Sequence, residues 1–140
     1  MLKHSYLNKK VKVRFSGIHH KGVFALEPLK KDEIISVWGG FIITQDDFNR
    51  LSKGEFKDIE NYATKVAEGF YLVSSKKGTL EDDDFFNHSC RPNAGIKGHL
   101  LMAAIRDIAR GEEITYDYAM TDADFDYSFK CVCQNKNCRG

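Results

Sequence analysis

Four cysteines are the residues of this 140-residue chain whose spacing points most directly to a chemistry. Three of them form the pattern Cys131-x-Cys133-x4-Cys138, and Cys90 is the only other cysteine. Closely spaced thiolates can point at one ion, and a structural zinc ion takes four such ligands in a tetrahedron. The spacing therefore predicts one zinc ion held by all four cysteines. Disulfides and free thiols are the alternatives, and the lack of a visible secretion signal argues against disulfides.

Two further segments are rich in side chains that can do chemistry. Residues 87–93 read Asn-His-Ser-Cys-Arg-Pro-Asn directly after two phenylalanines, which predicts a turn that offers hydrogen-bond donors, acceptors and a thiolate. Residues 111–118 read Gly-Glu-Glu-Ile-Thr-Tyr-Asp-Tyr, which predicts a strand after a tight turn. In a strand Tyr116 and Tyr118 would face the same side. This tyrosine pair either packs a sheet or places two hydroxyl groups at a site.

Short strands punctuated by glycines must position these segments. Alternating or continuous apolar residues predict strands at 11–15, 23–26, 33–38, 41–43, 62–66, 69–73, 100–106 and 113–118. Thr44 is a candidate N-cap for one short helix that runs to about Leu51. The length suits a single domain, and 42% hydrophobic with 29% charged residues excludes a wholly disordered chain. The pattern is typical of a mostly β domain, and no apolar run approaches the length of a membrane helix.

Charge is unevenly distributed although the net charge is only +1. Residues 1–31 carry eight Lys and Arg against one Glu, and residues 81–126 carry eleven Asp and Glu against four Arg and Lys. The acidic region is either a solvated face or a surface that attracts a cationic substrate.

Together these motifs resemble those of SET-domain protein lysine methyltransferases, in the same order along nearly the whole chain. Residues 16–25 resemble the family's opening strand and turn, 86–93 its Asn-His-Ser-Cys motif, 111–118 its Gly-Glu-Glu motif and 129–140 its post-SET zinc segment. The resemblance implies several small β-sheets, few short helices, a knot-like C-terminal threading and a zinc-binding tail. It divides the chain into a SET domain at 1–118, with a basic arm at 1–10, and a post-SET segment at 119–140.

The resemblance also implies a role for individual residues. Tyr118 matches the catalytic tyrosine, Tyr62 matches a second active-site tyrosine in the strand before a long loop, and Tyr116 matches a position that influences the number of methyl groups added. S-adenosylmethionine, the co-substrate, would bind against the following residues: Lys21, Gly22, Asn87, His88 and Phe129. Three positions depart from the family, because His20, Asp84 and Gln134 stand where glycine, arginine and glycine are common.

The expected function is S-adenosylmethionine-dependent methylation of protein lysines, mainly to the mono- and dimethyl forms. The expected substrate is a lysine-containing protein or peptide such as a histone tail, with no direct nucleic-acid binding and no membrane. The cytoplasm is the default compartment, and the nucleus is expected if the substrate is a histone. Two alternatives are a weakly catalytic SET module that binds a basic peptide or protein, and a zinc-stabilised interaction domain without a cofactor.

Overall fold

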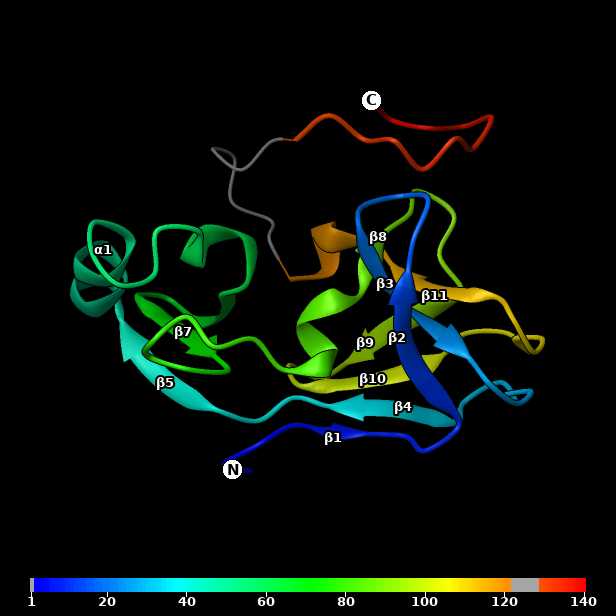
Figure 1. Cartoon of the computed structure of the whole chain (residues 1–140), viewed down its shortest axis with the longest axis horizontal. Helices are drawn as coiled ribbons and strands as arrows, with labels where there is room; N and C mark the ends of the chain where they lie inside the picture. The colour runs from blue at the N-terminus through cyan, green and yellow to red at the C-terminus, as the bar shows by residue number, and fades with distance from the viewer. Residues whose placement is uncertain (1, 122–128) are drawn as a thin grey trace.

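The computed structural model describes residues 2–121 and 129–140, and this part of the chain is mostly β-structure (Figure 1). Its strands are β1 Tyr6–Leu7, β2 Val11–Phe15, β3 Lys21–Ala25, β4 Ile34–Val37, β5 Phe41–Thr44, β6 Thr64–Ala67, β7 Phe70–Val73, β8 Asn87–His88, β9 Ala94–Lys97, β10 Leu101–Ala104 and β11 Glu113–Tyr116. Its helices are α1 Gln45–Ser52 and three 3-10 turns, η1 Ile59–Asn61, η2 Asp82–Phe85 and η3 Tyr118–Met120. The mostly β prediction is confirmed. None of the described helices has the length and apolar character needed to span a membrane.

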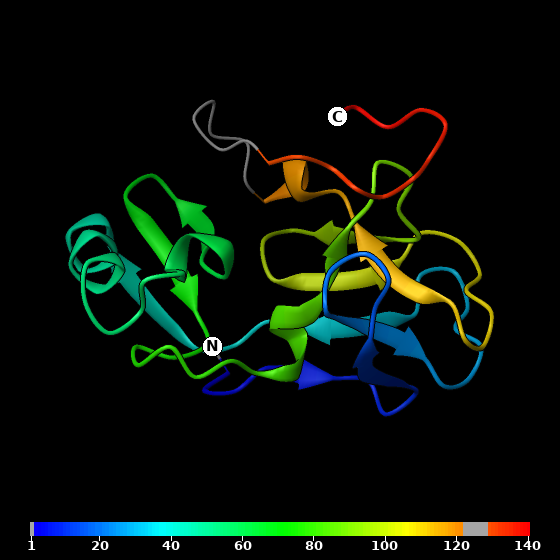
Figure 2. The ribbon, with the colours of Figure 1, turned by 45° about the horizontal axis from the view of Figure 1, so that its top comes forward.

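Three small sheets make up the fold. The first has the strand order β1-β4-β10-β9, the second β2-β3-β11-β8 and the third β5-β7-β6. The larger apolar core takes side chains from both four-stranded sheets, including Val23, Ile35, Met102 and Ile114, which are fully buried. The third sheet and α1 lie at one end of the molecule in both ribbon views (Figures 1 and 2), over a second core around Ile43.

The helix predicted from Thr44 is confirmed. Thr44 is the N-cap of α1, and its hydroxyl oxygen accepts a hydrogen bond from the backbone N–H of Asp47 at 3.2 Å. A capping side chain satisfies one of the four N–H groups that the first helical turn leaves unpaired. The acidic residues Asp46 and Asp47 stand in that first turn, where the helix dipole favours negative charge.

Strand β11 lies between β3 and β8, and the chain after β8 crosses it. β11 pairs antiparallel with β3 and parallel with β8. The backbone N–H of Ser89 donates to Tyr116 at 3.1 Å, and that of Asn93 donates to Thr115 at 3.2 Å. The buried amide of Asn93 completes the crossing: its oxygen accepts from the Thr115 N–H at 2.9 Å and its nitrogen donates to the Glu113 carbonyl at 2.8 Å. Earlier parts of the chain thus pair with both edges of β11, and the knot-like threading stays a prediction.

The expected strand at 113–118 is wrong at its C-terminal end. β11 ends at Tyr116, because the carboxylate of Asp117 accepts from the Ala119 N–H at 3.1 Å and begins η3. Tyr118 therefore does not share a strand face with Tyr116. Their rings nevertheless lie 5.0 Å apart, because the turn brings the second tyrosine back beside the first.

Two further expectations about local structure also differ from the fold. Tyr62 follows η1 and precedes β6, so it lies in a turn and not in the strand expected at 62–66. Asn87 and His88 form β8 and not a turn, because this two-residue polar strand exists only through its parallel pairing with β11. Such pairing is set by contacts distant in sequence, which local patterns do not record.

The crossing at Asn93 makes a direct prediction about stability. Replacing Asn93 by Ala leaves a buried N–H of Thr115 and a partly buried carbonyl of Glu113 without the Asn93 amide as partner. We expect Asn93→Ala to lower the free energy of unfolding by about 2–3 kcal/mol, measured by urea denaturation. Asn49→Ala, on the exposed surface of α1, is the matched control and should change stability by less than about 0.5 kcal/mol. Equal effects of the two substitutions would contradict the role given to Asn93.

Candidate active site and zinc site

A large pocket lies where the loop before β3, the start of β8 and the C-terminal tail come together. Its volume is about 530 Å³, which lies in the range of sites for cofactor-sized molecules. Residues 18–21, 87–88 and 129–132 are among those that line it. Four of the five residues expected to contact the cofactor are in this lining, namely Lys21, Asn87, His88 and Phe129. The Asn87 amide nitrogen donates to the Lys21 carbonyl across a separation of 66 residues in the sequence, so only the fold brings these two parts of the lining together.

Gly22, the fifth expected cofactor residue, is not part of that lining. A Cβ atom at this position would overlap the carboxylate of Glu113 and come within 3.0 Å of the Asn87 amide nitrogen. The glycine therefore makes room for Glu113 beside β3.

Glu113 is a positioning residue that the sequence patterns missed. The Asn87 amide nitrogen donates to its carboxylate at 2.7 Å and to the Lys21 carbonyl at 2.8 Å, and the Ser16 hydroxyl donates to the same carboxylate at 2.8 Å. These bonds join β3, β8 and β11 beneath the pocket. The second glutamate of the Gly-Glu-Glu motif was the signal that could have identified it.

Two of the positions that depart from the family have left-handed backbone conformations. His20 has φ +35° and Gln134 has φ +57°. Residues with a Cβ rarely adopt this region, whereas glycine enters it freely. The geometry thus accounts for the glycines that are common at both positions, and this chain forms the same turns with side chains present.

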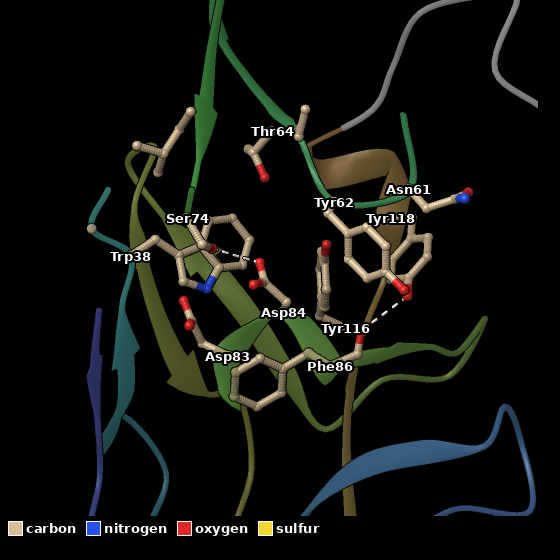
Figure 3. A pocket seen from close by; sticks show the side chains of 13 residues that line it. Trp38, Asn61, Tyr62, Thr64, Ser74, Asp83, Asp84, Phe86, Tyr116 and Tyr118 are labelled. Carbon is tan, nitrogen blue, oxygen red and sulfur yellow. Dashed lines mark hydrogen bonds between the residues drawn. The ribbon is translucent and has the colours of Figure 1, made fainter. Parts of the chain in front are cut away.

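A second, narrow pocket (Figure 3) shares part of its lining with the large one. Its volume is about 50 Å³, and Asn61, Tyr62, Asp84 and Tyr118 line both pockets. Tyr116 also lines it, and its hydroxyl lies between Asp84 and Tyr62 in the close view. The three tyrosines predicted to be catalytic are therefore brought together at the junction of a wide and a narrow space.

Hydrogen bonds fix the Tyr118 side chain at this junction. Its hydroxyl donates to the Phe86 carbonyl at 2.9 Å, and its backbone N–H donates to Nδ1 of His88 at 3.2 Å. The single hydroxyl proton is thus engaged, and the oxygen remains an acceptor. At the neighbouring Tyr62, burial raises the pKa of the phenol, and the charges of Asp58 and Asp84 act in the same direction. The hydroxyl of Tyr62 is therefore neutral near pH 7.

Two buried polar atoms of the narrow pocket have no hydrogen-bond partner among the described residues. They are Nε1 of Trp38 and Oδ1 of Asp83, whose residues are only 7% and 8% exposed. Burial raises the pKa of Asp83 to about 7, a hydrogen bond from the Ser5 side chain opposes this rise, and the charges of Asp84 and Glu81 add to it. Asp84, in contrast, accepts from the Ser74 hydroxyl and from the Glu81 N–H, both at 2.7 Å.

The four cysteines converge at the outer edge of the large pocket. Their sulfur atoms all lie within 4.8 Å of one another, and the Cys90 and Cys131 sulfurs are 3.7 Å apart. Four zinc–sulfur bonds of about 2.3 Å in a tetrahedron place the sulfurs about 3.8 Å apart. The cluster therefore fits one zinc ion with no coordination position left for solvent.

Several contacts join this cluster to the active-site side chains. Nδ1 of His88 accepts from Tyr118, so its proton is on Nε2, which lies 3.3 Å from the Cys90 sulfur and donates to it. Burial lowers the pKa of His88, which favours this neutral form. The ring of His88 also contacts that of Phe129 at 5.0 Å, edge to face. One imidazole thus contacts the cysteine cluster, the tail and Tyr118.

Comparisons with known proteins agree with this architecture. Residues 20–119 match the family described as SET domain. The chain is 31% identical to the Caenorhabditis briggsae protein named "Probable histone-lysine N-methyltransferase set-23", over 95% of this chain and 60% of that protein. It is 33% identical to the Saccharomyces cerevisiae protein named "Histone-lysine N-methyltransferase, H3 lysine-4 specific", over 100% of this chain and 14% of that protein.

Solved structures share the fold. One is the Polycomb Repressive Complex 2 of Chaetomium thermophilum in an autoinhibited conformation bound to S-adenosylmethionine, with a TM-score of 0.67 and 23% identity over 81% of this chain and 16% of that chain. The chain belongs to the SET-domain family, since the family match covers well over half of its residues. The SET-fold prediction is confirmed, whereas the boundaries at residues 118 and 119 and the roles of the individual site residues stay predictions. Residues 122–128 of the expected post-SET segment lie outside the described residues.

The cysteine geometry predicts a metal-dependent tail. We expect about one zinc ion per purified chain, and we expect Cys131→Ser to lower both the zinc content and the affinity for S-adenosylmethionine, because the tail carries Phe129 into the pocket lining. Metal analysis and calorimetric titration measure the two effects. Lys136→Ala, on the exposed side of the tail, is the control and should change neither. Undiminished cofactor binding by the metal-free Cys131→Ser protein would refute the prediction.

Proposed function

We propose that this chain is an S-adenosylmethionine-dependent protein-lysine N-methyltransferase with one structural zinc ion. The observation that supports this most is the meeting of the wide and narrow pockets at Tyr62 and Tyr118. A nucleoside-sized co-substrate in the wide pocket and a lysine side chain in the narrow one would meet end to end at these hydroxyls. The chain spans 60% of the worm relative and about one seventh of the yeast relative, so the activity remains a proposal for this chain.

The lining of the wide pocket suits S-adenosylmethionine. Lys21 offers a cationic group that complements the carboxylate of the methionine part. Phe129 offers a ring that can cover the adenine, held by its ring contacts with His88 and Tyr118. When bound, S-adenosylmethionine supplies an activated methyl group on a positively charged sulfur.

The residues of the narrow pocket prepare the lysine. Lysine has an ordinary pKa of about 10.4, and only its neutral form can accept a methyl group. Enclosure away from water disfavours the charged amine, as does a nearby positive sulfur. Because the Tyr118 proton is engaged with Phe86, its oxygen accepts a hydrogen bond from the amine N–H and turns the nitrogen lone pair toward the wide pocket.

The substrate we infer is a histone tail, with action at chromatin in the nucleus. The supporting observation is that the relatives are named as histone-lysine N-methyltransferases, several of them specific for lysine 4 of histone H3. The acidic segment around η2 also suits a basic peptide. We propose mainly mono- and dimethylation, since Tyr116 narrows the space beside Tyr118.

The test is incorporation of labelled methyl groups from S-adenosylmethionine into a panel of basic peptides and histones. Matched histone H3 peptides with Lys or Arg at position 4 distinguish the H3 lysine-4 site from others. Labelling of lysine on any panel member supports the enzyme. Peptide binding without turnover would instead indicate a weakly catalytic SET module, and failure to bind S-adenosylmethionine would indicate an interaction domain.

Tyr118 carries the first kinetic prediction. Tyr118→Phe removes the hydroxyl that orients the amine, while the ring and its packing stay in place. By analogy with the loss of one preorganised polar contact in other enzymes, we expect kcat to fall by about 10²–10³. Circular dichroism should show an unchanged fold. Full turnover by Tyr118→Phe would move the catalytic role elsewhere, with Tyr62 the next candidate.

The second kinetic prediction concerns Tyr116. A dimethylated amine needs room for added methyl groups, and replacing the Tyr116 hydroxyl by hydrogen frees a volume of about one water molecule. We therefore expect Tyr116→Phe to shift the products toward the di- and trimethyl forms of lysine, with a modest loss of total turnover. Mass spectrometry of a peptide over time measures the ratio. Abundant trimethyl product from the unmodified chain would contradict this steric argument.

A further inference from the structure

The narrow pocket contains an unusual charge for a space with aromatic walls. Asp83 is nine-tenths buried, and its Oδ1 atom lacks a hydrogen-bond partner among the described residues. Within that same part of the chain neither Asp83 nor Asp84 forms an ion pair with Lys or Arg. A buried carboxylate without a cation lowers stability, so its presence in a cavity points to a cationic ligand.

The donors and acceptors in the pocket restrict what that cation can be. Both oxygens of Asp84 already accept hydrogen bonds, from Ser74 and from the Glu81 backbone. The Asp83 carboxylate has a hydrogen bond from the Ser5 side chain, and its Oδ1 atom is the buried oxygen left without a partner. One such oxygen is too few for a calcium or magnesium ion, which requires six or more oxygen ligands. A guanidinium group prefers a bidentate acceptor and needs more space than about 50 Å³ provides. A primary ammonium group fits, since it is compact and donates single hydrogen bonds.

The aromatic walls support the same assignment. Tyr62, Tyr116 and Trp38 line the pocket together with Asp83 (Figure 3). The faces of aromatic rings attract cations, and this attraction strengthens where water is excluded. A carboxylate at one side of an aromatic pocket therefore selects a cationic head over a neutral one of the same size.

We propose that Asp83 is a specificity-determining residue of the narrow pocket, and that its Oδ1 atom binds the ammonium group of the incoming lysine side chain. This inference rests on the proposed function, because the ammonium group is taken to be that of the lysine that is methylated. Asp83 receives the charged lysine, and the tyrosine hydroxyls hold the neutral amine that reacts. The raised pKa of Asp83, about 7, agrees with a carboxylate that lacks a cationic partner before substrate enters.

Trp38 offers a direct reporter, because it is the only tryptophan in the chain and its Nε1 lies on the side of Asp83 in Figure 3. The experiment follows the indole N–H signal of the zinc-loaded full chain by NMR. The probe is n-butylammonium chloride, which has the end of a lysine side chain. Sodium chloride at equal ionic strength and n-butanol are the controls for salt and for the alkyl chain.

We expect the chemical shift of the Trp38 indole N–H to change with n-butylammonium concentration and to reach a plateau. We expect n-butanol and sodium chloride to leave it unchanged. Asp83→Asn should weaken n-butylammonium binding by at least about tenfold, as for a lost hydrogen bond to a charged group. Asp82→Asn, an exposed neighbour in η2 that does not line the pocket, should bind as the unmodified chain does.

Folding does not limit this test. Removal of an unpaired buried charge should raise the thermal midpoint of Asp83→Asn, and Asp83→Ala provides a second variant with the same expectation for binding. Equal affinity of native and Asp83→Asn protein, or an equal response to n-butanol, would overturn the inference and indicate that Asp83 only pairs with Trp38. The titration contains no S-adenosylmethionine, so it succeeds or fails independently of the methylation assay.

Discussion

The enclosure of β11 is the constraint on which the site depends. This strand is hydrogen-bonded to β3 on one edge and to β8 on the other, and the amide of Asn93 holds the chain that crosses it. Three side chains of the site come from β11 and the turn that follows it. Glu113 hydrogen-bonds the Asn87 amide beneath the wide pocket, and Tyr116 and Tyr118 line the narrow pocket. A shift of β11 by one residue would move all three side chains at once, because neighbouring residues of a strand point to opposite faces.

The cysteine cluster extends this arrangement to the end of the chain. Through the imidazole of His88, the cluster is two hydrogen bonds away from the backbone of Tyr118. Arg139 adds a second tie, since its guanidinium donates to the carboxylate of Asp117 at 2.6 Å. A metal ion held by the four cysteines would therefore restrain the residues on either side of the turn that positions Tyr118, in addition to the tail itself.

Much of the fold and of the candidate site could be predicted from the sequence, wherever a local or strongly specific residue pattern marked the feature. The cysteine spacing, the helix cap at Thr44 and the main strands required only short-range patterns. The missed features depended on contacts between distant segments. β8 exists through its pairing with β11, and Tyr62 is placed by η1. The acidic run that contains Asp83 reads as a surface, and only the packing of η2 against the core shows that one of its carboxylates is buried.

The lining of the wide pocket comes from both ends of the sequence, with Lys21 on one side and Phe129 on the other. This has a consequence for folding. Residues 129–140 follow every described strand in the sequence, so the sheets can form before this part of the pocket lining is in place. A ligand of the wide pocket would therefore stabilise only the state in which the tail has docked, and its binding would report that this last step is complete.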